Sequence, residues 1–158
     1  MAHRQGSRRR GDELTDIVSA HGGPTVTVRR VVTGDVDGRS RVIVDGPAHV
    51  DGAIDEIWVS SPSDPLGVDP AELAITLEPP AGGVRFRVAS IPPNSPRFHV
   101  TNTVDYLYVI DGDITLELDD GSVLLHPGDC VVQRETNHSW RNDNDFPVRL
   151  VAVMVSLA

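Results

Sequence analysis

Cysteine is scarce and lysine is absent in this chain, and each absence excludes a chemistry. The 158 residues contain one cysteine, Cys130, so no internal disulfide can form, which is typical of proteins in a reducing cytosol. Because Cys130 begins an apolar strand, we expect its thiol to be buried and unreactive. All 14 basic residues are arginine, so a mechanism that forms a Schiff base on lysine is excluded.

Long apolar runs are also missing. No stretch approaches the roughly 18 apolar residues of a membrane span, and the N-terminus has no apolar signal core. The formal net charge is −9, which argues against nucleic acid or an anionic membrane as a partner. We therefore expect a soluble, cytoplasmic protein that binds neither nucleic acid nor membrane.

Turn-forming residues are abundant. The 14 glycines and 12 prolines favour many turns over a helical bundle. About ten short β-forming segments lie between them, which predicts an all-β sandwich or double-sheet jelly roll. We expect residues 1–24 to form a flexible N-terminal tail and residues 25–158 a single barrel. Residues 61–70 contain several prolines and glycines, and we expect a loop there.

The clearest local signal spans residues 103–118. Apolar residues alternate with other residues on both sides of the turn signal Asp111-Gly112. This pattern predicts a β-hairpin, because a tight turn between two segments of period two is its usual sequence signature.

Strand alternation also predicts which side chains share a face. If the segment before the turn is extended from residue 99 onward, His99, Thr101 and Asp105 lie on one face. Tyr106 and Tyr108 then face the other way, and we expect them at the second sheet or at a dimer contact.

Residues 98–142 resemble the cupin superfamily. In that family, a first motif of the form H-x-H-x(3,4)-E precedes a strand that ends in glycine. A second motif places a histidine shortly after a P-G-D turn, with an asparagine four residues later. The residues of this chain that match are His99, Asp105, Gly112, Pro127-Gly128-Asp129, His138 and Asn142.

The chain departs from the family pattern at three positions. Thr101 stands where the first motif has its second histidine, and Asp105 stands where it has glutamate. Glu135 stands where a glycine is expected three residues before His138. The resemblance implies a double-stranded β-helix, which is the jelly-roll barrel of the cupins, with an N-terminal extension. It also implies a homodimer.

The resemblance also implies a site in the mouth of the barrel. The matching ligand positions for a divalent metal are His99, Asp105 and His138. Two histidines and one carboxylate suit Fe(II), and the same set suits Zn or Mn; we expect no organic cofactor. Such a site is compatible with a dioxygenase, decarboxylase, isomerase or cyclase that acts on a small organic molecule or secondary metabolite.

Two other interpretations use the same residues. Burial would raise the pKa of Asp105 and lower that of His138, so this pair could act as the catalytic acid and base of a metal-free isomerase, cyclase or dehydratase. Alternatively, the pair forms hydrogen bonds inside the barrel of a non-catalytic, ligand-binding cupin.

Four further residues are candidates for contact with the small-molecule substrate. Arg85 and Arg87 share one face of their strand, and if that face points inward Arg87 could bind a substrate carboxylate with two parallel N–H bonds. If that face points outward instead, both arginines are exposed to solvent. Gln133, Trp140 and Thr101 are the other candidates, because their positions place them near the mouth of the barrel.

Overall fold

The computed structural model describes residues 27–157. The predicted tail, residues 1–24, lies outside the described residues. In the described part of the chain, no helix is long and apolar enough to cross a membrane.

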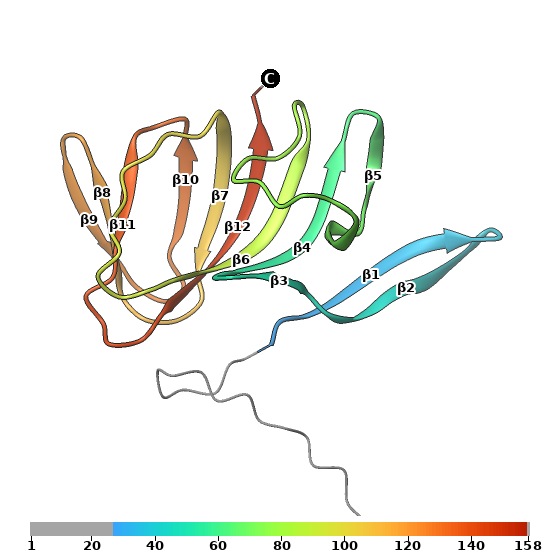
Figure 1. The fold of residues 1–158 in the computed structure, drawn as a ribbon, viewed down its shortest axis with the longest axis horizontal. Helices are drawn as coiled ribbons and strands as arrows, with labels where there is room; N and C mark the ends of the chain where they lie inside the picture. The colour runs from blue at the N-terminus through green and yellow to red at the C-terminus, as the bar shows by residue number, and fades with distance from the viewer. Residues whose placement is uncertain (1–26, 158) are drawn as a thin grey trace, which may run out of the picture.

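Twelve strands and one short 3-10 helix make up the described chain (Figure 1). In chain order they are β1 (Arg29–Val36), β2 (Arg39–Pro47), β3 (His49–Asp51), β4 (Ile54–Ser61), β5 (Asp64–Val68), η1 (Pro70–Glu72), β6 (Val84–Ile91), β7 (Thr103–Val109), β8 (Ile114–Leu118), β9 (Gly121–Leu125), β10 (Cys130–Arg134), β11 (His138–Arg141) and β12 (Val148–Ser156). The predicted all-β class is confirmed.

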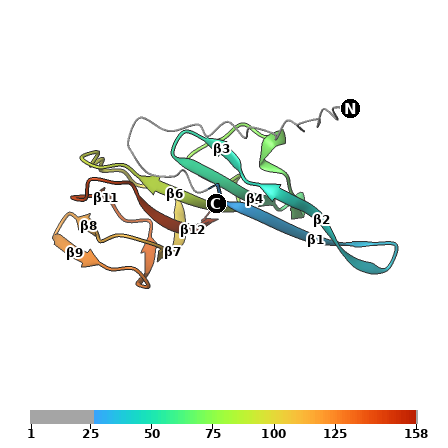
Figure 2. The same ribbon diagram turned by 90° about the horizontal axis from the view of Figure 1, so that it is seen from below.

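The strands form three antiparallel sheets. A seven-stranded sheet has the order β10-β7-β12-β6-β4-β3, with β5 added at β4, and a three-stranded sheet has the order β11-β8-β9. The strands β1 and β2 pair only with each other and extend away from the rest (Figures 1 and 2). Consecutive strands pass from one large sheet to the other, which is the double-stranded β-helix that the sequence resemblance implied.

The predicted hairpin between β7 and β8 is wrong. The strand β7 pairs with β10 and β12, whereas β8 pairs with β11 and β9. The turn itself is present: Gly112 has a φ of 68°, and an added Cβ would lie 2.7 Å from Cγ2 of Val148. The turn therefore carries the chain from one sheet to the other, because β12 already occupies the edge of β7 at which a hairpin partner would pair.

One expectation about the first half of the chain also needs correction. Residues 61–70 contain the strand β5, which pairs with β4, so they are not wholly a loop.

The strands β1 and β2 are joined by a tight turn after Val36. The hairpin turn there is Asp37-Gly38, where both residues have positive φ, as a two-residue turn between twisted strands requires.

An apolar core fills one end of the barrel between the two large sheets. Its buried members are Val109, Ile114, Leu116, Leu125, Val148 and Leu150. The inner face of β7 changes from apolar to polar along its length, since Val109 belongs to this core while Asp105 and Thr103 are buried at the other end. Polar groups are therefore held inside the molecule at the end opposite the packed core.

The expectation of a buried Cys130 is wrong: its side chain is exposed. Cys130 lies opposite Tyr108 in the β10–β7 ladder, and Tyr106 and Tyr108 are exposed by 52% and 46%. Successive residues of a strand point to opposite faces, so the thiol shares the outer face with the tyrosines. The tyrosines do face away from Asp105, as predicted.

Candidate functional site

The polar end of the barrel is built on the strand alternation that the sequence predicts. Thr101, Thr103 and Asp105 are 3%, 1% and 5% exposed, whereas Val100 and Tyr106 are each 52% exposed. The segment thus turns one polar face inward. Burying a carboxylate is costly unless it is paired, so this arrangement marks the inner face as a candidate site.

His99 and His138 meet across a short two-residue bridge. The backbone N–H of each histidine donates to the carbonyl of the other, with both N···O distances at 3.0 Å. The centroids of the two imidazole rings are 4.3 Å apart. The resemblance placed these residues in two separate motifs, and the structure brings them side by side at the edge of β11.

Backbone contacts define the tautomer of both rings. Nδ1 of His99 lies 3.0 Å from the carbonyl oxygen of Arg97, and Nδ1 of His138 lies 2.9 Å from that of Thr136. A carbonyl oxygen can only accept, so each Nδ1 carries a hydrogen. In the neutral imidazoles, Nε2 is therefore the nitrogen with a free lone pair, available as a base or a ligand.

Asp105 and His138 have pKa values shifted in opposite directions. Burial raises the pKa of Asp105, and burial lowers the pKa of His138. In each case the low-polarity surroundings favour the neutral form. The Oδ1 atom of Asp105 is buried without a hydrogen-bond partner among the described residues. The two shifts are in the directions that favour a proton-donating carboxyl group and a proton-accepting imidazole, the two roles of an acid–base pair.

The predicted substrate contacts Gln133 and Thr101 both lie at this end. Gln133 is directly opposite Asp105 in the β10–β7 ladder and is 3% exposed. Its side-chain nitrogen contacts the hydroxyl of Thr136, in the turn before His138. The hydroxyl of Thr103 donates to that of Thr101 over 2.8 Å, which satisfies part of the buried polar surface.

Trp140 lies at the boundary between the polar site and the apolar core. It is partly buried against the core residues, and its ring makes an edge-to-face contact with His138 at a centroid distance of 6.0 Å. The side chain therefore forms an apolar wall beside His138.

Arg87 points inward and is 4% exposed, so the solvated alternative for this residue does not apply. Its guanidinium is already engaged. Nη2 lies 2.7 Å from Oε1 of Glu56, and the carbonyls of Thr76 and Leu77 accept hydrogen bonds over 2.9 and 3.1 Å. Glu56 is not among the residues that the sequence predicted for the site. The available signal was an acid in a β-forming segment that also contains Ile57 and Trp58.

The asparagine of the second motif is structural. Asn142 is fully buried, and its amide nitrogen donates to the carbonyls of Ile91 and Phe146, both over 2.8 Å. Its amide oxygen accepts from the backbone N–H and the side chain of Asn144 over 2.9 and 2.8 Å. These four bonds fix the turn that follows β11.

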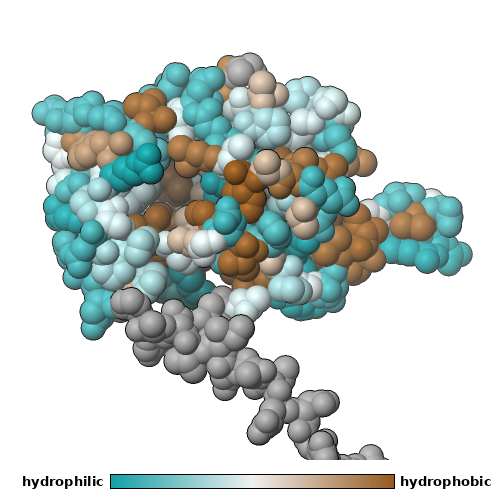
Figure 3. All heavy atoms as spheres, viewed as in Figure 1, coloured by the Kyte–Doolittle hydropathy of each residue, from teal (hydrophilic) through white to brown (hydrophobic). Residues whose placement is uncertain are grey.

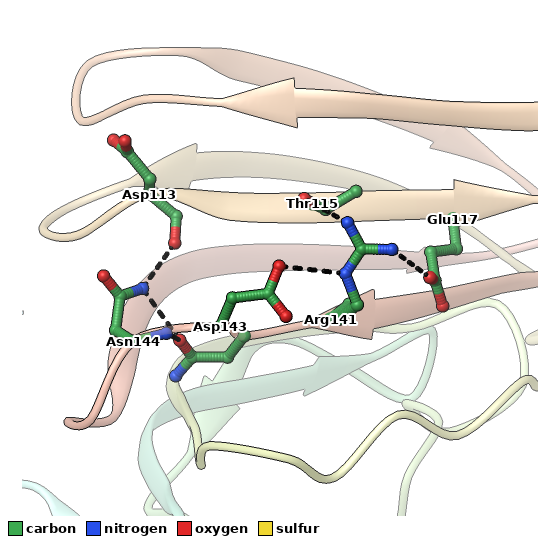
Figure 4. A network of polar contacts seen from close by, with 7 residues as sticks. Asp113, Thr115, Glu117, Arg141, Asp143 and Asn144 are labelled. Carbon is green, nitrogen blue, oxygen red and sulfur yellow. Dashed lines mark hydrogen bonds and ion pairs between the residues drawn. The ribbon is translucent and has the colours of Figure 1, made fainter.

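A surface network attaches β11 to β8 (Figure 4). Arg141 contacts Glu117 at 2.8 Å, Asp143 at 3.0 Å and Thr115 at 3.4 Å, and the side chain of Asn144 donates to the carbonyl of Asp113 over 2.7 Å. The strand that carries His138 is thus held at its C-terminal end by polar contacts. Figure 3 shows a recess in the surface, left of centre, where Figure 1 places β10 and β7.

The residues do not assemble into the predicted metal triad. Over residues 27–157, no group of three or more His, Cys, Asp or Glu side chains is arranged to hold a metal ion. The histidine pair by itself has a feature of metal ligands, since each Nδ1–H is held by a backbone carbonyl. The missing element, in the described part of the chain, is a carboxylate grouped with both rings.

The fold and the polar end of the barrel define a class, the double-stranded β-helix proteins with a site inside the barrel. Residues 87–154 match the family model described as Cupin domain. This segment is therefore similar to the cupin domain family.

Curated relatives match a segment about as long as the one that matches the family model. Phomopsin biosynthesis cluster protein C' of Diaporthe leptostromiformis is 46% identical over 63 residues, which cover 39% of this chain and 33% of the relative. Oryzines biosynthesis cluster protein J of Aspergillus oryzae is 45% identical over 64 residues, covering 40% and 36%. The match thus spans about a third of each relative, and both relatives are named for biosynthesis clusters.

Solved structures that align with this chain include two cupin domains. A conserved barrel domain protein from Salinispora arenicola is 18% identical with a TM-score of 0.44, covering 54% of this chain and 72% of that one. The cupin domain of an XRE family transcriptional regulator from Enterobacter cloacae is 18% identical with a TM-score of 0.42, covering 48% and 83%.

Proposed function

We propose that this protein is an enzyme that moves protons on a small organic molecule inside the barrel, as an isomerase, cyclase or dehydratase does. The observation that carries the proposal is that Asp105 and His138 are both buried at the polar end of the fold, where each influences the pKa of the other. Relatives named for biosynthesis clusters support a substrate from secondary metabolism. In this reaction class, neutral His138 takes a proton from the substrate at Nε2, and neutral Asp105 donates one from its carboxyl group.

The surrounding residues have supporting roles in this proposal. The carbonyl of Thr136 keeps the hydrogen of His138 on Nδ1, so Nε2 remains the basic atom. Trp140 supplies an apolar wall, and Gln133 and Thr101 supply polar contacts to the substrate. A dry, enclosed site strengthens each of these interactions.

The protonation states of the two side chains test this proposal. In NMR titrations of isotope-labelled protein, we expect His138 to titrate below its ordinary value of 6.5 and Asp105 above its ordinary value of 3.8. His126 is a control outside the site, with a pKa raised by its hydrogen bond to Asp113. If His138 and Asp105 both titrate at their ordinary values, the acid–base proposal is wrong.

A divalent-metal enzyme using Fe, Mn or Zn is the second candidate. It is favoured by one observation, the two adjacent histidines whose Nδ1–H groups are both fixed by backbone carbonyls. Elemental analysis after reconstitution with each metal separates the candidates. One metal ion per chain that is lost in the His99→Ala and His138→Ala variants supports the metal enzyme, and no stoichiometric metal in the unaltered protein contradicts it.

We propose that the protein acts as a homodimer in the cytoplasm. Two exposed apolar surfaces support the dimer. One is the outer face around Tyr106, Tyr108 and Val132, and the other is the β1–β2 hairpin, where Val42 and Ile43 are 56% and 50% exposed. An isolated two-stranded hairpin is only marginally stable in water, so a second copy that covers these surfaces stabilises both.

A further inference from the structure

Three buried charged side chains lie on the inner face next to the acid–base pair, and none of them belongs to a cupin motif. Glu56 of β4 is fully buried, and Arg85 and Arg87 of β6 are 2% and 4% exposed. Glu56 is directly opposite Arg87 in the β4–β6 ladder. Arg85 is two residues away on the same strand and therefore on the same face.

Both guanidinium groups bind the same carboxylate oxygen. Oε1 of Glu56 lies 3.2 Å from Nη1 of Arg85 and 2.7 Å from Nη2 of Arg87. The remaining bonds of the arginines go to a neighbouring segment, to the hydroxyl and carbonyl of Thr76 and the carbonyl of Leu77. The Nε atom of each arginine and Oε2 of Glu56 have no partner among the described residues.

This cluster holds more positive than negative charge. Two cations share one anion, and an unpaired charge inside a protein is unfavourable. Asp105 does not complete the pairing. In the sheet, Met154 on β12 stands between Asp105 and Arg85, and neither arginine forms an ion pair with Asp105. Burial lowers the pKa of Arg87, and the charge of Arg85 lowers it further, whereas Glu56 raises it.

The segment that satisfies Arg87 is neutral and irregular. Residues 73–83 contain no helix or strand, and Figure 1 shows them crossing in front of β6 and β12 after η1. The carbonyl oxygens of Thr76 and Leu77 accept from the two Nη atoms of Arg87, where the two oxygens of a carboxylate bind an arginine end-on. Carbonyl groups satisfy the hydrogen bonds but do not neutralise the charge, whereas a carboxylate does both.

We propose that Arg85 and Arg87 form an anion-binding subsite, which takes a carboxylate group of the ligand in exchange for the carbonyls of Thr76 and Leu77. Glu56 is a positioning residue that holds the two guanidinium groups together. This subsite deepens the proposed function by naming the substrate class as a small carboxylic acid. It rests on that function only in placing the acid beside Asp105 and His138.

The test uses a matched pair of probes, benzoate and the neutral benzamide, with the full-length protein. The side-chain Nε–H signals of Arg85 and Arg87 and the backbone N–H signals of Thr76 and Leu77 are followed by NMR. We expect benzoate to shift all four signals in a saturable way at about millimolar concentration, and benzamide to shift none of them. Absence of saturable binding up to about 50 mM benzoate, or an equal response to benzamide, overturns the subsite.

Variants that change the buried charge test the role of Glu56. Glu56→Gln keeps a side-chain oxygen that can hold both guanidinium groups in place but removes the negative charge that competes with benzoate, so we expect benzoate to bind roughly tenfold more tightly. Arg87→Gln should weaken binding roughly tenfold. Arg149→Gln is the matched control, because Arg149 pairs with Asp111 away from the cluster, and its affinity should be unchanged. A merely structural role of Glu56 predicts loss of binding in Glu56→Gln, and equal affinity in all variants contradicts the proposal.

The outcomes separate this subsite from the proposed function. Benzoate binding with ordinary pKa values at Asp105 and His138 retains the anion subsite and removes the acid–base enzyme. Shifted pKa values at Asp105 and His138 without benzoate binding retain the acid–base enzyme and remove the anion subsite. If a variant fails to fold by circular dichroism, the two probes with the unaltered protein still decide the question.

Discussion

His99 and His138 exchange two backbone hydrogen bonds of 3.0 Å while their rings lie 4.3 Å apart. The two residues are thereby held by the backbone and not by flexible side-chain contacts. This geometry joins the loop before β7 to the edge of β11, and so connects the two large sheets at the polar end of the barrel. The candidate site depends on this connection, because Asp105 lies on one sheet and His138 on the other.

The first prediction concerns the pH dependence of stability. Burial raises the pKa of Asp105, so the folded state holds this proton more tightly than the unfolded state. The stabilisation that Asp105 contributes is complete below pH 3.8, the ordinary pKa of the group. It is lost as the pH rises through the raised pKa of the folded state. Asp105→Asn cannot ionise, and it should be more stable than the unaltered protein at pH 7 by on the order of 1 kcal/mol. Thermal unfolding at several pH values measures the difference.

The same comparison contains its control. The stability gained in Asp105→Asn should shrink toward zero below pH 3.8, and the exposed Asp120→Asn should show no comparable trend. A variant that is less stable than the parent at pH 7 by a similar amount would show that the ionised carboxylate is paired.

The second prediction concerns Asn142, whose side chain makes four hydrogen bonds. Asn142→Ala removes a buried amide that donates to the carbonyls of Ile91 and Phe146, at a cost of about 1–3 kcal/mol for each group left unsatisfied. We expect the free energy of unfolding to fall by about 3 kcal/mol in denaturant titrations. Asn137→Ala, which loses one exposed bond to Asp119, should cost less than about 1 kcal/mol.

The third prediction concerns Glu135, where the family pattern has glycine. Its φ is 49°, in the left-handed region that costs a residue with a side chain roughly 1–2 kcal/mol. Glu135→Gly removes that strain but adds freedom to the unfolded chain. The net expectation is a gain of about 0.5–1 kcal/mol, measured by thermal unfolding. Glu117→Gly is the contrasting control: in the interior of β8 the same change should destabilise.

The fourth prediction concerns the outer face of the seven-stranded sheet. If a second copy covers Tyr106, then Tyr106→Arg places a charge in that interface, and light scattering should report a monomer. Leu124→Arg is the control, since Leu124 is similarly exposed at 55% but lies on β9 of the other sheet. An unaltered protein that is monomeric at high concentration would contradict the proposed homodimer, as would a Tyr106→Arg variant that stays dimeric.

Local sequence pattern predicted much of the secondary structure. The strand Ile114–Leu118 occurs where alternation and turn residues placed it, and a strand begins at Cys130, as predicted. The inward face of Thr101 and Asp105 followed from the same alternation. These features could be predicted because they depend on neighbours a few residues apart, which determine local backbone conformation and the side of the strand on which each side chain points.

Pairing between distant segments was decided by the tertiary structure. A hairpin signal at Gly112 could not reveal that β7 pairs with β10 and β12, because a turn residue permits a change of direction and does not select a partner strand. The exposure of Cys130 and the burial of Glu56 against Arg87 likewise depend on which strand lies opposite. The sequence by itself therefore determined the strands and the polar face. The fold decided which charges meet, since their partners lie tens of residues away and are joined only by packing.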